Sequence, residues 1–144
     1  MKELNAQEAH DLLQSDREYT YLDVRSVPEF EAGHPAGAIN IPIMDLAPGV
    51  GMTPNQDFAA VVEATLRKDA KLLVGCKSGV RSARACEAMS QMGFTDVANV
   101  RGGFVGAVDN LGRVTEPGWS MLNLPLCKEC DEEARYEALK AKTR

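Results

Sequence analysis

The segment KLLVGCKSGVRSARACEAMSQMG, residues 71–93, decides the fold of this chain. Residues 71–75 are apolar and short enough for a buried strand, and residues 81–92 have the composition of a helix that Gly93 ends. A lone cysteine, Cys76, stands between them. In parallel α/β sheets, ligands bind where strands end and helices begin. The sequence therefore predicts that Cys76 lies at the carboxyl edge of a parallel sheet, where ligands bind.

Strand-like and helix-like segments alternate along the rest of the chain. The predicted strands are a short edge segment at Leu4 and residues 19–24, 37–43, 71–75 and 96–100; the predicted helices are residues 6–15, 27–32, 54–68 and 81–92. Alternation of this kind favours a parallel sheet covered by helices. We expect a three-layer α/β fold with a central parallel sheet of about five strands and helices on both faces.

Local signals place the starts of two predicted helices. Asn5 stands three residues before Glu8, which is the spacing of a capping box. Thr53 precedes Pro54, so we expect Thr53 to cap the helix and Pro54 to occupy its first position.

Composition limits the classes of function. The chain has 144 residues, 44% of them hydrophobic, and a net charge of -5. An acidic chain is a poor general ligand for nucleic acid, so no nucleic-acid partner is expected. No apolar run reaches membrane-spanning length, and the first residues lack the apolar core of an export signal. We expect a cytoplasmic protein without a membrane partner.

The predicted domain covers residues 1–126. Residues 127–144 are expected to form a tail, packed on the domain or extending from it, that contains a Cys-x-x-Cys motif and a short charged helix. Residues 110–126 have a loop-like pattern.

The residues that follow Cys76 indicate an activated thiol. Gly79 permits tight curvature, Lys77 and Arg81 add positive charge, and the following helix adds the positive end of its dipole. Each feature favours the thiolate, which is the nucleophilic form of cysteine. The alternative is a packing role, in which Cys76 ends a buried strand and the cations face water.

The residues CKSGVRS, 76–82, resemble the active-site loop of single-domain rhodanese-type sulfurtransferases. The similarity extends to YLDVRSVPEFEAGHPAGAINIP upstream and to MGFTDVANVRGGF downstream, and so covers residues 4–104. Leu124 and Pro125 are weakly similar. The chain departs from the family pattern in lacking a tryptophan soon after the Gly-Gly turn, where Phe104 stands, and Trp119 comes much later.

The resemblance implies sulfur transfer without a cofactor. Cys76 would take the outer sulfur of thiosulfate or a similar anionic donor as a persulfide, and then pass it to cyanide, a thiol, or a thioredoxin-like or other sulfur-accepting protein. The N–H groups of the loop would hold the anionic persulfide. Lys77 and Arg81 would guide the donor. The expected substrate-binding residues are Lys77, Ser78, Gly79, Val80 and Arg81.

Two alternatives remain open on the sequence. Related phosphatases and arsenate reductases have five residues between cysteine and arginine, whereas Cys76 and Arg81 enclose four and no acidic residue stands in the loop. A persulfide carrier or partner-binding module, with little thiosulfate turnover, needs the same activated cysteine. The sequence does not separate this carrier from the enzyme.

Three residues outside the loop are candidate supports for the site. Asp23 and Arg25 follow a predicted strand, where they would orient the loop or meet the donor; the alternative is an ion pair that ties loops together. His34 could act as a base, although a thiolate needs none, and a hydrogen bond to the backbone is the alternative.

The remaining cysteines suggest other roles. Cys127 and Cys130 would form a disulfide, a redox pair or a sulfur relay from Cys76. A zinc site needs more ligands than these two cysteines supply, so no metal is expected. Cys86, in the helix after the loop, is assigned to packing.

Overall fold

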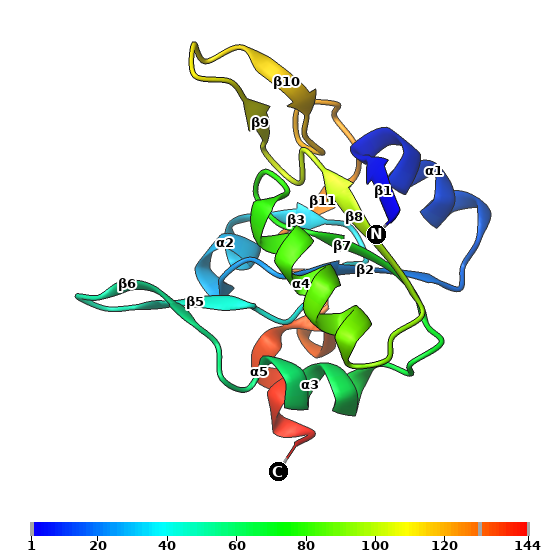
Figure 1. The fold of residues 1–144 in the computed structure, drawn as a ribbon, viewed down its shortest axis with the longest axis vertical. Coiled ribbons are helices and arrows are strands. Elements are labelled where there is room, and N and C mark those ends of the chain that lie inside the picture. The colour runs from blue at the N-terminus through cyan, green and yellow to red at the C-terminus, as the bar shows by residue number, and fades with distance from the viewer. Residues whose placement is uncertain (1, 130, 144) are drawn as a thin grey trace.

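A five-stranded parallel sheet forms the centre of the computed structural model, which describes residues 2–129 and 131–143 (Figure 1). The strands lie in the order β1 (Lys2–Asn5), β8 (Asp96–Arg101), β7 (Lys71–Gly75), β2 (Tyr19–Asp23) and β4 (Ile39–Asn40). Every neighbouring pair is parallel. The predicted α/β class is therefore confirmed, with β7 in the middle of the sheet.

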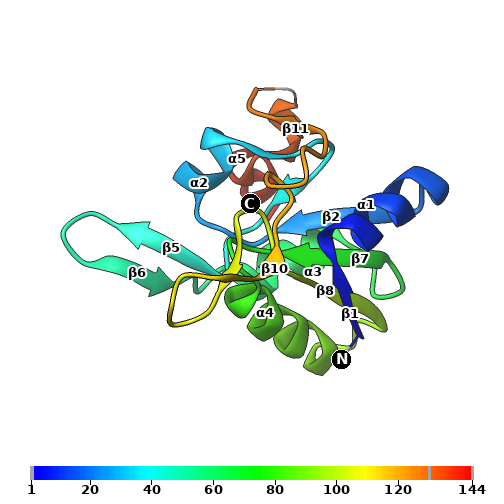
Figure 2. The same cartoon turned by 90° about the horizontal axis from the view of Figure 1, so that it is seen from above.

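Helices cover both faces of the sheet (Figures 1 and 2). Side chains of α3 (Phe58–Thr65), α4 (Val80–Gln91) and α5 (Tyr136–Ala141) share one apolar core with the sheet, and those of α1 (Ala6–Ser15) and α2 (Val27–Ala32) contribute to the other. Leu72 and Val74 point into the first core and Leu73 into the second. This alternation along β7 is what a strand buried on both sides requires.

The helix signals of the sequence were right at α1 and wrong at α3. Asn5 and Glu8 form the predicted capping box. Thr53 and Pro54 instead belong to strand β6, and α3 begins at Phe58. The reason is that residues 51–54 pair with an earlier strand, which keeps Thr53 in an extended conformation.

Two hairpins that the sequence did not predict project from the sheet (Figure 1). One joins β5 (Met44–Ala47) to β6 (Gly51–Pro54), and the other joins β9 (Gly106–Val108) to β10 (Val114–Pro117). Their strands have three or four residues each, which is too short for the alternation that reveals a strand. A further short pair joins β3 (His34–Pro35) to β11 (Leu126–Cys127).

The C-terminal segment packs on the domain. After the short 3-10 helix η1 (Glu132–Ala134), Tyr136 and Leu139 of α5 are buried in the core shared with α3 and α4. The side chain of Asn55 donates to the Tyr136 hydroxyl at 3.0 Å.

Across the described residues, no helix has the length and apolarity needed to cross a bilayer.

Candidate active site

Cys76 lies at the carboxyl end of the central strand, where β7 gives way to α4. Its residue is 2% exposed, and the N–H of Gly79 points at its Sγ from 3.1 Å. Gly79 precedes the first residue of α4 and has φ 115, a conformation that L side chains rarely adopt. Of the loop N–H groups in the described chain, only that of Gly79 bonds the sulfur. The sulfur therefore faces the positive end of a helix.

The segment after β8 supports the loop from behind. Phe104 and Val105 donate their N–H groups to the carbonyl oxygens of Cys76 and Lys77, at 2.8 and 2.9 Å. These bonds fix the peptide planes at the start of the loop. Gly103, with φ 53, lies so close to the Cys76 carbonyl that a side chain there would overlap it. The Gly-Gly turn is thus required by this close approach.

A second glycine, Gly75, is required by Tyr21. A β-carbon on Gly75 would overlap the buried Tyr21 hydroxyl. That hydroxyl has no hydrogen-bond partner among the described residues, and burial raises the pKa of Tyr21 well above its ordinary value. The Tyr21 ring therefore packs against the backbone immediately before Cys76.

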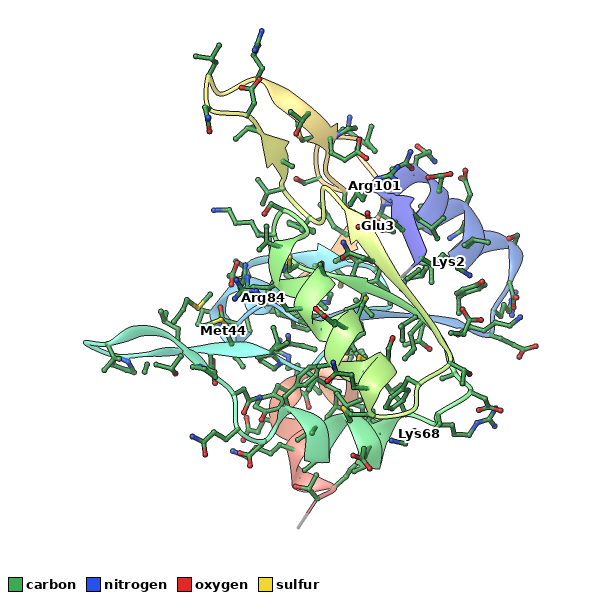
Figure 3. The ribbon with its side chains drawn as sticks, in the orientation of Figure 1. Lys2, Glu3, Met44, Lys68, Arg84 and Arg101 are labelled. Atoms are coloured by element: carbon green, nitrogen blue, oxygen red, sulfur yellow. The ribbon has the colours of Figure 1, made fainter. Side chains whose placement is uncertain are left out.

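A buried polar chain leads from the sulfur to the edge of the sheet. The Ser82 hydroxyl lies 3.4 Å from Cys76 Sγ and 2.5 Å from Asn99 Oδ1. The Asn99 amide donates to Glu3 Oε1 at 2.8 Å and to the Gly79 carbonyl at 3.3 Å. Ser82 is 0% and Asn99 2% exposed, and Figure 3 shows Glu3 beside Arg101 at the β1–β8 edge. Sequence reasoning missed these residues, although a polar residue inside the apolar strand DVANVR is a usable signal.

Arg81, the predicted donor-binding cation, is held by Glu29. Its two Nη groups donate to the two carboxylate oxygens at 2.7 and 3.0 Å. Burial works to raise the pKa of Glu29, but the hydrogen bonds from Arg81 and Ser26 lower it to about 2. The pair also raises the pKa of Arg81. The positive charge of Arg81 is therefore balanced inside the protein, and sequence reasoning missed Glu29.

The other loop residues are more open to solvent. Lys77 is exposed and, within the described residues, forms no ion pair; Val80 is 64% exposed and Ser78 is half-buried. A pocket of about 310 Å³ adjoins the loop and is lined by Arg25, Glu29, Ala32, Gly33, Lys77, Phe104 and Val105. Lys77 is thus the loop cation left to meet an anion at this pocket.

Asp23 and Arg25 form a buried ion pair beside the loop. Arg25 Nη2 lies 2.7 Å from Asp23 Oδ2, with 4% and 1% of the side chains exposed. The same nitrogen donates to the Gly33 carbonyl at 2.6 Å, and the guanidinium lies over the Phe104 ring. This pair connects β2, the end of α2 and the segment behind Cys76.

The side chain of His34 bonds the backbone and packs on a neighbouring ring in this structure. Its Nδ1 lies 2.8 Å from the Phe30 carbonyl and its ring stacks on that of Phe30 at 3.6 Å. Burial lowers the pKa of His34, although the bond to Phe30 acts to raise it. These contacts fix the turn after α2.

The other cysteines lie apart from the loop mouth. Cys86 is fully buried, and burial raises the pKa of its thiol to about 12. Cys127 is buried in β11, opposite His34 of β3. Cys130 lies outside the described residues, so the Cys127–Cys130 pair stays a prediction. Within the described chain, no three His, Cys, Asp or Glu side chains are grouped to hold a metal ion.

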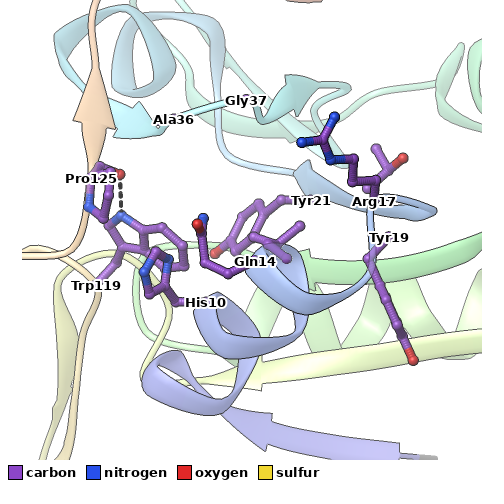
Figure 4. A pocket seen from close by; sticks show the side chains of 11 residues that line it. His10, Gln14, Arg17, Tyr19, Tyr21, Ala36, Gly37, Trp119 and Pro125 are labelled. Atoms are coloured by element: carbon purple, nitrogen blue, oxygen red, sulfur yellow. Dashed lines mark hydrogen bonds between the residues drawn. The ribbon is translucent and has the colours of Figure 1, made fainter.

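A separate pocket of about 300 Å³ lies near Trp119 (Figure 4). It is lined mainly by residues of α1 and β2, and His10 meets the Trp119 ring edge-on at 5.5 Å. The Trp119 indole N–H donates to the Pro125 carbonyl at 2.7 Å, and the backbone N–H of Trp119 donates to the Gly103 carbonyl at 2.9 Å. Trp119 is thus adjacent to the Gly-Gly turn in space, because the β9–β10 hairpin separates them only in sequence.

Comparisons with known proteins agree with this arrangement. A crystal structure of the Rv0390 protein from M. tuberculosis has a TM-score of 0.74 at 24% identity, and covers 89% of this chain and 98% of that one. A rhodanese-related protein from Thermoplasma volcanium has a TM-score of 0.56 at 29% identity, and covers 90% of this chain and 100% of that one. The first likeness is one of fold alone.

Sequence relatives reach higher identity. Thiosulfate sulfurtransferase 16, chloroplastic, of Arabidopsis thaliana is 42% identical over 96 residues, which are 67% of this chain and 78% of that protein. The senescence-associated protein DIN1 of Raphanus sativus is 41% identical over 92 residues, or 64% of this chain, and the match spans only 50% of its length. The family model of the rhodanese-like domain matches residues 5–110. On this sequence match and this fold, the chain belongs to the rhodanese-like domain family.

Proposed function

We propose that this protein is a sulfurtransferase that moves a sulfane sulfur through a persulfide on Cys76. The donor is thiosulfate or a similar small anion, and the acceptor is cyanide, a thiol or a sulfur-accepting protein. No resident cofactor takes part. The single observation that carries the proposal is the position of the Cys76 sulfur at the end of β7, with the Gly79 N–H aimed at it from the start of α4.

The proposed chemistry has two balanced steps. The Cys76 thiolate attacks the outer sulfur of thiosulfate, a new S–S bond forms, and the old S–S bond breaks with its electron pair leaving on sulfite. The product is a persulfide whose negative charge lies on the outer sulfur. The acceptor then attacks that outer sulfur, and the electron pair of the breaking bond returns to Cys76 as thiolate.

The surroundings of the sulfur support this use. A helix N-terminus and an aimed N–H favour negative charge at the thiol and on its persulfide. Lys77 offers a charge at the mouth of the adjoining pocket. Two relatives from Arabidopsis thaliana, at 42% and 39% identity, carry the name thiosulfate sulfurtransferase.

Intact mass measurement tests the proposal. After incubation with thiosulfate, we expect the protein to gain one sulfur atom, which cyanide then removes. Cys76→Ala should gain none. Cys86→Ala is the matched control, because it removes a buried thiol from the same region and should still load. Loading that persists in Cys76→Ala would refute the proposed nucleophile.

A persulfide carrier is the second candidate, and one observation favours it. Glu29 balances the charge of Arg81, so the site attracts a doubly charged donor less strongly than the loop sequence suggests. Steady-state assays with thiosulfate and cyanide separate the two functions. Rapid turnover would identify the enzyme, whereas full loading with negligible turnover would identify the carrier.

The ion pair with Glu29 also bears on the phosphatase alternative. Both Nη groups of Arg81 are bonded to the Glu29 carboxylate, which disfavours their use in binding a phosphate.

A further inference from the structure

The orientation of the Asn99 side chain is fixed by its neighbours. Its nitrogen has two acceptors, Glu3 Oε1 at 2.8 Å and the Gly79 carbonyl at 3.3 Å. Both can only accept, so the amide nitrogen faces them and the amide oxygen faces Ser82. Asn99 Oδ1 is therefore an acceptor aimed at the Ser82 hydroxyl.

Ser82 has one hydroxyl proton and two acceptors within reach. Asn99 Oδ1 is 2.5 Å away, and Cys76 Sγ is 3.4 Å away. Because Asn99 Oδ1 has no proton to give, the short contact with it must use the Ser82 proton. Ser82 then presents a lone pair to the sulfur. That arrangement suits a sulfur that is protonated or uncharged, and it does not suit a thiolate.

We propose that Asn99 is a positioning residue that keeps the Ser82 proton away from Cys76 and thereby favours the persulfide over the free thiolate. In the thiolate, the negative charge sits on Sγ, and Ser82 must leave Asn99 to donate to it. In the persulfide, Sγ is uncharged and the charge lies on the outer sulfur, so Ser82 keeps its bond to Asn99. The persulfide part of this inference rests on the proposed function; the effect on the thiolate does not.

Other charged and titratable groups around the sulfur are not removed by a change at Asn99. Arg81 and Cys86 on α4 and Tyr21 on β2 interact electrostatically with Cys76, and Glu29 on α2 balances Arg81. Glu3 on β1 is linked to the sulfur through Asn99 and Ser82. A variant at Asn99 also removes the bonds to Glu3 and to the Gly79 carbonyl, and the Ser82→Ala background separates the effect of the Ser82 proton from those losses.

The first arm of the test measures the rate of Cys76 alkylation by iodoacetamide as a function of pH. Asn99→Leu removes the acceptor while keeping the branched shape of the side chain, and frees Ser82 to donate to the sulfur. We expect the midpoint of the alkylation curve to move about one pH unit lower, which is about tenfold in thiolate population. In a Ser82→Ala background the same change should have no effect, because the proton it redirects is gone.

A second variant guards against misfolding of Asn99→Leu. Glu3 is an exposed residue of the edge strand, and Glu3→Leu releases one acceptor that orients the amide. We expect a smaller shift in the same direction, again abolished by Ser82→Ala. Asn110→Ala, in an exposed turn, is the matched control and should leave the curve unchanged. A shift that persists without Ser82, a shift to higher pH, or no shift would overturn the proposal.

The second arm measures persulfide occupancy by intact mass in a fixed mixture of thiosulfate and sulfite. At a pH above the midpoint of the wild-type alkylation curve, where the unloaded protein is thiolate, Asn99→Leu should lower the ratio of loaded to unloaded protein about tenfold, because it stabilises the thiolate alone. An unchanged or higher ratio would overturn the persulfide part. If the wild-type protein takes up no sulfur, the proposed function fails, and the alkylation arm still decides the role of Asn99.

Discussion

The Arg81 guanidinium in α4 holds both carboxylate oxygens of Glu29 in α2, at 2.7 and 3.0 Å. This contact joins the end of the Cys76 loop to the segment that follows β2. It also decides how much positive charge the loop offers to an anion, because each charge of the pair compensates the other.

Glu29→Gln should therefore improve the use of thiosulfate. With the carboxylate removed, the charge of Arg81 is no longer balanced, so the site attracts a dianion more strongly. We expect kcat/KM for thiosulfate to rise several-fold at low ionic strength, and that for the singly charged donor methanethiosulfonate to rise less. Glu31→Gln, on the same helix, is the matched control. An equal rise in Glu31→Gln would mean that only the net charge of the protein matters.

The same pair makes stability depend on pH. The pKa of Glu29 is lowered from its ordinary value of 4.5 to about 2 in the folded protein. The stabilisation from its ionised form is complete above pH 4.5 and is lost as the pH falls through 2. Glu29→Gln should thus reduce the free energy of unfolding at pH 7 and have little effect near pH 2. Urea unfolding at both pH values checks this, and an equal loss at both would contradict the ion-pair explanation.

Gly103→Ala should disturb the Cys76 loop. A methyl group there overlaps the Cys76 carbonyl, in addition to the cost of φ 53. Gly112 is the matched control, since it has φ 78 and no atom lies within 4 Å of the place that a β-carbon would take there. We expect Gly112→Ala to cost about 1 kcal/mol and leave Cys76 alkylation unchanged. Gly103→Ala should cost more and slow alkylation; equal behaviour of the two variants would argue against the close approach.

Cys86 should stay unmodified under conditions that label Cys76. Burial raises the pKa of the Cys86 thiol to about 12, so it remains protonated below that pH. Peptide mapping after brief iodoacetamide treatment at pH 8 should find the label on Cys76. Labelling of Cys86 at a comparable rate in the folded protein would be inconsistent with its position in the core.

The central part of the fold was predictable because its signals are local. Residues 71–75 and 96–100 are short segments rich in apolar residues, and the capping box at Asn5 and Glu8 fixes the start of α1. The start of α3 was not predictable in this way. Thr53 and Pro54 have the composition of a helix start, but pairing with the preceding strand overrides that preference.

The position of Cys76 at the end of the central strand was predictable, and the electrostatics around it were less so. Cys76 and Gly79 follow from the strand–loop–helix pattern. The partner of Arg81 is 52 residues away in sequence, and the local signal at Glu29, its capping-box spacing from Ser26, predicts a helix start rather than a contact with Arg81. Asn99 lies 17 residues from Ser82. Such long-range pairs arise from tertiary packing, which a single sequence does not display.

The base of the β9–β10 hairpin is closed independently of its tip. The backbone N–H groups of Trp119 and Ser120 donate to the carbonyls of Gly103 and Phe104, each at 2.9 Å. The two ends of the hairpin therefore lie side by side where they join the domain. Within the described chain, the tip between Val108 and Val114 adds no bond to the Cys76 loop. The tip can therefore be lengthened, shortened or replaced, for example with a fluorescent reporter or an affinity epitope, without loss of a hydrogen bond to the Cys76 loop.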